Sequence, residues 1–584
     1  MKKSLSKVIL IALLLAILSV QSGFSVPADP NFEFTITQPN GEVISLKPVG
    51  DERNGRYITL DGYTVTKQTD GWYYYAQLDS QGQLTASEYK VTTEKNRTAE
   101  LISFLQTIPQ SLSAENRFRV YPDPKMQPEL LKNSALQKAI EANNNVLVIL
   151  IQYYDYPAIK DSAQFDALMN EPGYDIYGSA NDFYQECSYG QFGITSDVTP
   201  WYTADSDYLF YAYNDGNNWV AAAQLAREAI VWASVARDID FSKYDNDGDG
   251  EVEGLFIVHA GPGAETGASD FPWSHKWWLS AAGLAPVVTD GVTIDAYTME
   301  PELHSGTEIA RIGVFVHEFG HALGLPDLYG TYGIGSWGVM SGGSWGGGGK
   351  CPVHFSAWSK AQLGWTNPIN ILADTTDVLL PDASTSPVSY RLWNEGTVGP
   401  EYFLVEYRGK TNFDQFLPGC GVAIWHIDET VTGAWTETHR RVDLEEANNI
   451  ENNSAANVWI DKTFGIITAP NSNTNDGDST NVQIAVTSIA CDAAGMTADF
   501  AVGLPPGCCL TMRGNVDNDL NDEITIADIV YFVEYSFAVP KGPDPVCFEE
   551  ADVDASNDLT IADLVYLVEY SFASPAGPAP LICP

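Results

Sequence analysis

Five consecutive residues, His317-Glu318-Phe319-Gly320-His321, combine two imidazoles and a carboxylate at a spacing suited to hydrolysis. Residues four apart share one face of a helix, so both histidines can bind one cation. Glu318 lies beside them, where a carboxylate can take a proton from a water molecule on that cation. The chain holds only 8 histidines, so this motif rarely arises by chance. It predicts a catalytic zinc site rather than two unrelated surface histidines.

The residues that follow supply candidates for the rest of that site. Gly324 can end the helix with a positive φ and turn the chain back, which offers Asp327 as the third zinc ligand. Two nitrogens and one carboxylate leave the fourth zinc position open for water. Tyr329 is a candidate donor to a developing oxyanion, and Met340 lies in a glycine-rich turn typical of the floor of such sites. The alternatives are a turn-forming role for Asp327 and simple packing for Met340.

A second cluster of oxygen ligands alternates with turn-forming residues. Asp245, Asp247 and Asp249 occupy positions 1, 3 and 5 of a loop, and Glu253 occupies position 9. Hard cations prefer such ligands, and Gly250 at position 6 permits a sharp turn. Position 12 is not Glu, so this is not a complete EF-hand. We favour structural calcium over a solvated acidic turn.

The C-terminal residues carry an internal repeat. The segment from Thr525 to Tyr531 recurs 35 residues later, from Thr560 to Tyr566. Each copy starts with a 12-residue oxygen-rich loop that leads into an apolar helix, which predicts two calcium sites. Their expected ligands are Asp517, Asp519, Asn521, Thr525 and Asp528 in the first loop, and Asp552, Asp554, Ser556, Thr560 and Asp563 in the second.

Charge and the N-terminus restrict the possible partners. Asp and Glu outnumber Lys and Arg by 76 to 31, giving a net charge of −45, which disfavours nucleic acid and anionic membranes. Basic residues precede an apolar run from Val8 to Leu18, followed by small and polar residues to Ser25. This pattern is typical of a signal peptide rather than a membrane anchor. We expect a secreted chain without a membrane span after signal removal.

Changes in pattern along the chain predict an α+β multidomain fold. Val146–Ile151 and Leu255–His259 read as buried strands, while 219–238 and 307–325 read as helices. Short alternating strands dominate residues 32–88 and, as an antiparallel sandwich, residues 374–502. The expected parts are a signal peptide (1–25), a propeptide-like β unit with linker (26–135), a zinc peptidase domain (136–372), a β-sandwich (373–503) and a calcium-binding helical tail (504–584).

Two parts of the chain resemble known families. The zinc motif through Asp327, with Met340, resembles the immune inhibitor A family of secreted bacterial zinc endopeptidases. Further matching segments lie at 182–190, 258–261, 273–275, 421–428 and 442–447. The resemblance implies a metzincin-like catalytic domain, a following β-sandwich and a latent precursor (zymogen). The tail resembles dockerin type I modules, which implies a cohesin-like partner. Its candidate contacts are Tyr531, Tyr535, Tyr566 and Tyr570, although core packing explains these side chains more readily.

These patterns predict a secreted zinc metalloendopeptidase with bound calcium that acts on proteins and peptides. The alternatives are a non-catalytic binding or scaffold protein with structural zinc and a zinc hydrolase of small substrates. All eight cysteines follow Asp182, so disulfides are expected, with pairing left open. Because no thiol precedes Cys187, latency requires an oxygen ligand or steric cover. His259 and His275 are weaker candidates as zinc ligands.

Overall fold

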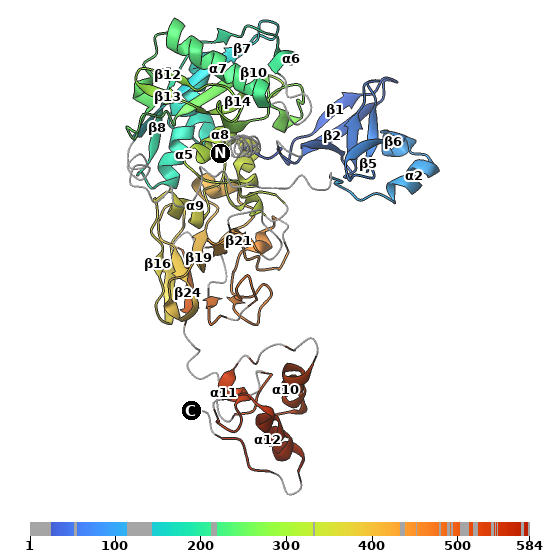
Figure 1. Cartoon of the computed structure of the whole chain (residues 1–584), viewed down its shortest axis with the longest axis vertical. Coiled ribbons are helices and arrows are strands. Elements are labelled where there is room, and N and C mark those ends of the chain that lie inside the picture. Colours follow the sequence, from blue (N-terminus) through green and yellow to red (C-terminus); the bar gives the residue numbers. More distant parts are fainter. Residues whose placement is uncertain are drawn as a thin grey trace, which may run out of the picture.

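The structure of the chain is a computed structural model (Figure 1). It describes residues 25–581, except for 52–54, 114–142, 212–218, 331–332, 432–438, 451–452, 478–479, 488–490, 492–494, 503–512, 518–523, 539–541, 543–544, 546, 557 and 574–576. The signal-peptide prediction therefore lies outside the described residues, apart from Ser25. Among the described residues, no helix combines the length and apolarity needed to cross a bilayer.

The central body is built on a mixed sheet with the order β11-β14-β10-β7-β8. The neighbours β14, β10, β7 and β8 run parallel, whereas β11 is an antiparallel edge. The strands are β7 (Asn143–Gln152), β8 (Gly193–Val198), β10 (Leu255–Pro262), β11 (His275–Trp278) and β14 (Ala296–Ser305). Two short strands, β9 (Tyr202–Thr203) and β15 (Glu308–Ile309), extend it, and β12 (Val287–Thr289) pairs with β13 (Val292–Ile294).

Helices cover both faces of this sheet because its strands are apolar on both sides. Phe256 and Val258 of β10 pack in one core with Phe315 and Phe319 of α8 (Ile312–Ala322), while alternate β10 residues pack in a second core with α7 (Trp219–Ala236). The remaining helices of this part are α4 (Ser162–Asn170), α5 (Ala180–Cys187), α6 (Tyr208–Tyr211) and α9 (Ala357–Gln362). The expected buried strands and the helix at 219–238 are present.

The helix predicted from Thr307 begins later than expected. Residues 308–309 form β15 and pair with β14, so α8 starts at Ile312. This strand pairing links segments by tertiary contact, which helical periodicity does not detect. The C-terminal end of this helix follows the prediction, since α8 ends at Ala322 and Gly324 adopts a φ of 96°.

The N-terminal part is a six-stranded antiparallel meander that stands to one side of the central body (Figure 1). Its strands are β1 (Phe34–Thr37), β2 (Val43–Val49), β3 (Arg56–Thr59), β4 (Thr64–Lys67), β5 (Tyr73–Leu78) and β6 (Leu84–Lys90), followed by α2 (Ala99–Leu105). Alternating apolar residues of these strands form a separate small core with α2.

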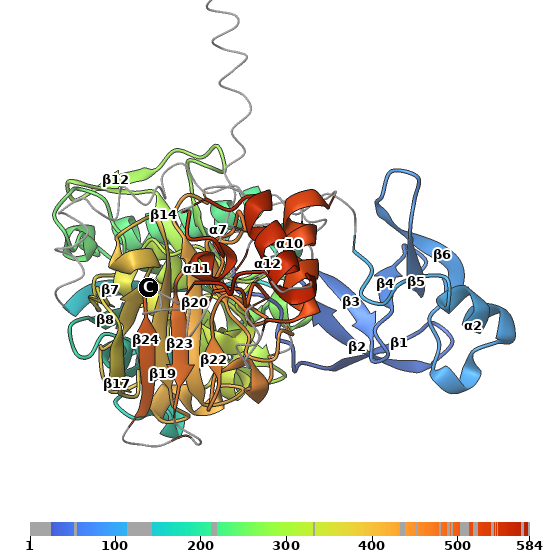
Figure 2. The same cartoon turned by 90° about the horizontal axis from the view of Figure 1, so that it is seen from below.

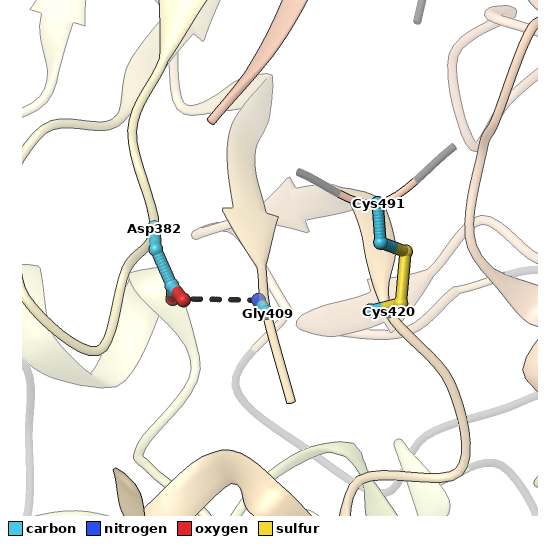
Figure 3. The surroundings of a disulfide bond; sticks show 4 residues. All are labelled: Asp382, Gly409, Cys420 and Cys491. Atoms are coloured by element: carbon cyan, nitrogen blue, oxygen red, sulfur yellow. Dashed lines mark hydrogen bonds between the residues drawn. A yellow bond between two sulfur atoms is a disulfide. The ribbon is translucent and has the colours of Figure 1, made fainter. Parts of the chain in front are cut away.

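Two further sheets follow the central body and share one core. One has the order β16-β18-β19-β20-β21 and the other β17-β24-β23-β22. Their strands are β16 (Ile369–Asn370), β17 (Thr375–Leu380), β18 (Tyr390–Leu392), β19 (Glu401–Arg408), β20 (Gly421–Asp428), β21 (Val442–Leu444), β22 (Thr463–Phe464), β23 (Gln483–Val486) and β24 (Met496–Ala501). A disulfide between Cys420 and Cys491 joins two segments of this part that are 71 residues apart in the sequence (Figure 3).

The tail contains α10 (Ile526–Phe537), α11 (Phe548–Ala551) and α12 (Ile561–Phe572), which lie together in both views (Figures 1 and 2). Phe532 and Leu567 are buried in its own small core. Cys547 is in a disulfide. Cys508, Cys509 and Cys583 lie outside the described residues.

Candidate active site

Helix α8 and the turn after it bring three ligand atoms together. His317 Nε2 lies 3.2 Å from His321 Nε2 and 3.3 Å from Asp327 Oδ1, and His321 Nε2 lies 3.1 Å from the same oxygen. Tetrahedral zinc with bonds of about 2.0–2.1 Å separates its ligand atoms by about 3.3 Å. The three separations therefore fit one zinc ion.

Hydrogen bonds fix how the two imidazoles face this centre. His317 Nδ1 lies 2.8 Å from the carbonyl oxygen of Val339, and His321 Nδ1 lies 2.7 Å from that of Leu325. A carbonyl only accepts, so each Nδ1 carries the proton and each Nε2 presents a lone pair. Two lone pairs and a carboxylate oxygen at these distances repel one another unless a cation lies between them. The donor set therefore fits a metal.

Electrostatics favour the ligand forms of these side chains. Burial would raise the pKa of Asp327, but the two neighbouring imidazoles outweigh it and lower the pKa to about 2. Burial lowers the pKa of His321, which favours its neutral form. Metal ligands must be deprotonated in this way.

Glu318 and Tyr329 border the same centre. Glu318 is fully buried, and its Oε1 accepts a hydrogen bond of 2.6 Å from the backbone N–H of Val26. The ring of Tyr329 stacks on that of His317 at an interplanar angle of 27°, with centroids 6.3 Å apart. Glu318 thus contacts a peptide group at this centre, and Tyr329 lies beside one of the candidate ligands.

Met340 packs against helix α8. An added Cβ at Gly320 would lie 2.5 Å from Met340 Sδ, so the sulfur is packed directly against α8. The carbonyl of Met340 accepts a hydrogen bond of 2.7 Å from the N–H of Leu328. The Met340 loop therefore supports both the helix and the turn that leads from Asp327 to Tyr329.

The segment from Ser25 to Asp29 lies in this site, which the sequence did not indicate. The carbonyl oxygen of Ser25 is 3.1 Å from His317 Nε2, and the Val26 side chain is fully buried in the core that contains α8. The indoles of Trp273 and Trp345 donate hydrogen bonds of 2.8 Å to the carbonyls of Val26 and Pro27.

The same segment makes further contacts along its length. Ala28 packs against Ala264 and Trp273, and the N–H of Asp29 donates to the carbonyl of Glu265. Trp273 belongs to a segment singled out by the family resemblance, but no sequence signal pointed to Trp345.

The structure places the other histidine candidates elsewhere. His259 Nδ1 lies 3.0 Å from the Ala260 carbonyl, and His275 contacts the Trp273 carbonyl and the Tyr297 hydroxyl. Burial lowers the pKa of each to about 4. They are buried neutral residues of the sheet.

Two acidic clusters match the expected calcium loops. Carboxylate oxygens of Asp245, Asp247, Asp249 and Glu253 lie within 4.8 Å of one another, as do those of Asp552, Asp554 and Asp563. Burial and the charge of Asp247 raise the pKa of Glu253 to about 8.

The tail loops differ in how far they can be described. In the first loop, the candidate ligands that the structure describes are Asp517, Thr525 and Asp528, and Asp528 accepts from the N–H groups of the other two. Asp519 and Asn521 lie outside the described residues. In the second loop, Asp563 likewise accepts from the N–H groups of Asp554 and Thr560.

Sequence comparisons agree with this geometry. Residues 132–366 match the family model for the catalytic domain of immune inhibitor A peptidase M6. The pre-pro-metalloprotease PrtV of Vibrio cholerae serotype O1 is 28% identical over 297 residues, covering 41% of this chain and 32% of PrtV. Immune inhibitor A of Bacillus thuringiensis subsp. alesti is 28% identical over 296 residues, which cover 39% of this chain and 41% of that protein. The chain thus spans less than half of each relative. Residues 132–366 form a peptidase domain of the immune inhibitor A type, homologous to both proteins.

Proposed function

We propose that this chain is the precursor of a secreted zinc-dependent endopeptidase of metzincin-like type. The observation that carries the proposal is the meeting of His317, His321 and Asp327 around one point, with Glu318 beside a bound peptide group. A purely structural zinc site needs no such base. The M6 match and the name of PrtV support the same reaction class.

Each residue has a role in this proposal. Zinc held by the three ligands supplies Lewis-acid activation of water and of the scissile carbonyl. Glu318 accepts the water proton and passes it to the leaving nitrogen, since its carboxylate lies within hydrogen-bond reach of a peptide N–H. Tyr329 donates to the developing oxyanion. The carbonyls of Val339 and Leu325 hold the imidazoles in the ligand tautomer.

The Glu318→Gln variant tests this mechanism. Gln keeps the shape and the acceptor oxygen but cannot take a proton, so we expect peptide hydrolysis to fall by about 10²–10⁴-fold. Zinc content, measured by elemental analysis of the same sample, should stay near one per chain. Hydrolysis equal to that of the parent protein would exclude Glu318 as the base.

The contacts of residues 25–29 support a latent precursor. They cover Glu318 and bring a carbonyl oxygen, that of Ser25, to the zinc ligands. This agrees with the expectation that latency without a thiol uses an oxygen ligand or steric cover. The basic and apolar residues at 2–18 support export through a signal peptide.

Calcium binding and partner docking complete the proposal. The clustered carboxylates at 245–253 and 552–563, with the repeated loop at 517–528, support structural calcium. In the tail, Tyr531, Tyr535 and Tyr566 pack against the core, which favours the packing interpretation for the tyrosines. A matching apolar stripe is instead exposed on each helix, and it supports a cohesin-like partner. Its members are Ile526, Val530, Val533 and Phe537 on α10, and Ile561, Val565, Val568 and Phe572 on α12.

A further inference from the structure

The segment that begins at Ser25 lies in the site in the direction expected of a substrate. The carbonyl oxygen of Ser25 is 3.1 Å from His317 Nε2, and the next peptide N–H, that of Val26, donates to Glu318 at 2.6 Å. Metal-assisted hydrolysis places the carbonyl of the cleaved bond at the metal and its nitrogen beside the general base. The peptide bond between Ser25 and Val26 has this order. The residues after it therefore mark where a substrate would continue after its cleaved bond.

Two tryptophans of the peptidase domain bind the carbonyls that follow this peptide bond. Trp273 Nε1 donates a hydrogen bond of 2.8 Å to the carbonyl of Val26, and Trp345 Nε1 donates one of 2.8 Å to the carbonyl of Pro27. An indole N–H only donates, and both distances are those of good N–H···O hydrogen bonds. Two successive main-chain carbonyls are thus each bound by a side chain.

Trp273 is anchored by the peptidase domain itself. The buried carboxylate of Glu265 accepts hydrogen bonds from the Oγ–H and the N–H of Ser274, at 2.8 and 3.2 Å. The carbonyl of Trp273 accepts a hydrogen bond of 2.7 Å from His275 Nδ1, and its side chain clusters with Ala264. All these residues lie within 132–366, so cleavage before the peptidase domain leaves these contacts in place.

Trp345 is held by another part of the same domain. Its side chain packs in the core that contains α8. Its ring lies 5.9 Å from that of His304, and an added Cβ at Gly349 would be 3.2 Å from Trp345 Cε3. These contacts also belong to the peptidase domain. Two segments about 70 residues apart in the sequence therefore present their indole N–H groups to one extended chain.

We infer that the indole N–H groups of Trp273 and Trp345 bind the main chain of the substrate, at the first and second residues after the cleaved bond. This inference rests on the proposed endopeptidase function. Because both groups bind carbonyls rather than side chains, they position substrates of varied sequence and accept proline at the second residue. A substrate with one residue after the cleaved bond lacks the acceptor for Trp345, so the pair favours cleavage within a chain.

The test weakens single carbonyl acceptors in a peptide substrate of the processed enzyme. One peptide has an ester in place of the amide between the first and second residues after the cleaved bond, and another has it between the second and third. An ester carbonyl is a weaker acceptor than an amide carbonyl, so each ester weakens one indole hydrogen bond. We expect each ester to lower kcat/KM by about three- to tenfold relative to the all-amide peptide.

The N–H groups that the esters remove correspond to positions without a contact to the peptidase domain in this segment. Pro27 has no N–H, and the N–H of Ala28 donates to the carbonyl of Gly50 in the N-terminal part. The loss of kcat/KM therefore reports the carbonyls.

Phenylalanine variants connect each ester effect to one indole. Trp273→Phe keeps an aromatic ring but removes the N–H, so it should abolish the effect of the first ester only. Trp345→Phe should abolish the effect of the second ester only. The two variants are controls for each other, because a general loss of structure would not select one ester. Trp201→Phe is a matched control elsewhere in the domain, since Trp201 Nε1 donates to the carbonyl of Lys160. It should keep both ester effects.

The outcomes separate this inference from the proposed function. Equal kcat/KM for amide and ester peptides, or ester effects that survive both Phe variants, overturn the role of the indoles and leave the endopeptidase intact. Failure of the zinc-loaded parent to cleave any peptide overturns both.

If a Phe variant does not fold, the parent enzyme alone still decides. A third peptide has its ester between the fourth and fifth residues, where the corresponding carbonyl of Asp29 accepts from Phe32 of the same segment. This ester should leave kcat/KM unchanged. Equal losses with all three esters overturn the inference.

Discussion

At the scale of single residues, the site combines side chains whose roles depend on their neighbours' backbone groups. The imidazoles of His317 and His321, the proposed zinc ligands, are oriented by the carbonyls of Val339 and Leu325. The HExxH spacing predicts the ligands because positions i and i+4 of a helix share one face, a purely local rule. The orienting carbonyls could not be predicted, because one of them comes from a loop 22 residues away.

A histidine away from the catalytic site should control stability at alkaline pH. His426 on β20 lies 2.9 Å from Glu401 and 3.1 Å from Glu445. Burial disfavours its charged form, but these carboxylates outweigh burial and raise its pKa to about 9. Against an unfolded pKa near 6.5, it contributes about 3 kcal/mol below pH 6.5, and this is lost as the pH rises through 9.

The measurement is the thermal midpoint between pH 7.5 and 10. Asp443, opposite His426 in the sheet, has its pKa raised to about 7 by burial and by Glu445, so its own effect ends below this window. The parent protein should lose stability across the window, and His426→Gln should lose much less. Parallel pH profiles for the two proteins would contradict this assignment.

At the scale of elements, a short N-terminal segment covers helix α8, and its Val26 side chain is fully buried in the core that contains this helix. Replacing Val26 with Gly removes that side chain, and burial of a Val contributes about 1.5–3 kcal/mol. The segment should then leave the cleft about ten to a hundred times more often, so the unprocessed precursor should hydrolyse a quenched peptide faster than the parent precursor.

Val43→Gly serves as the control because Val43 is 55% exposed at the start of β2. The latency of that precursor should match the parent. If Val26→Gly were as inactive as the parent precursor, another element would have to provide the cover.

Strand β19 also contacts the loop that contains Trp337 and Met340. Arg408 at its end is fully buried, binds both oxygens of Asp414 at 2.7 and 2.8 Å and donates to the Trp337 carbonyl at 3.1 Å. Removing one member of a buried ion pair leaves an unpaired charge, so Arg408→Met or Asp414→Leu alone should lower the free energy of unfolding by about 3–5 kcal/mol.

The double variant should lose clearly less than the two single changes together, because neither member of the Arg408–Asp414 pair is then left buried without the other. Glu406, 3.3 Å from Arg408 Nη1, loses that contact equally in the single Arg408 variant and in the double variant. Urea unfolding of all four proteins gives the coupling energy. Strict additivity would show that the pair contributes nothing as a pair.

The elements themselves were predictable to different extents. The buried strands β7 and β10 and helix α7 follow from apolar runs and helical spacing. The start of α8 was misjudged because Glu308–Ile309 pair with β14. Local patterns identify how a segment buries its apolar side chains, whereas pairing between distant strands depends on the assembled sheet.

At the scale of the whole molecule, calcium should order two separate loops. Each clusters carboxylates that repel one another without a cation. In the Glu318→Gln background, which avoids self-digestion, added calcium should slow hydrogen exchange at residues 245–253 and 552–572. Mass spectrometry of peptic fragments measures both regions in one sample.

The two loops serve as controls for each other. Asp563→Ala should abolish the protection of the tail only, and Asp249→Ala that of the first loop only. Exchange rates that are the same with and without calcium at both loops would contradict calcium binding.

The arrangement of the whole chain was the least predictable aspect. Ser25 contacts His317, a proposed zinc ligand 292 residues later, and Glu446 lines a cavity together with Pro27 and Ala28. Such contacts depend on how separate parts of the chain pack together. Neither the composition nor the periodicity of the sequence predicts that packing. The resemblance to immune inhibitor A could suggest a precursor, but it did not indicate which residues cover the site.

Two glycines of α8 show how tightly the catalytic helix is built in. An added Cβ at Gly313 would lie 2.0 Å from the Ser344 carbonyl oxygen, and one at Gly320 would meet Met340 Sδ at 2.5 Å. Seven residues apart, both face the loop beneath the helix. Even alanine, which ordinarily strengthens helices, would force helix α8 away from this loop. His317 and His321 would move with the helix. Conventional thermostabilising replacements of helical glycines would therefore displace the proposed zinc ligands if made at these two positions.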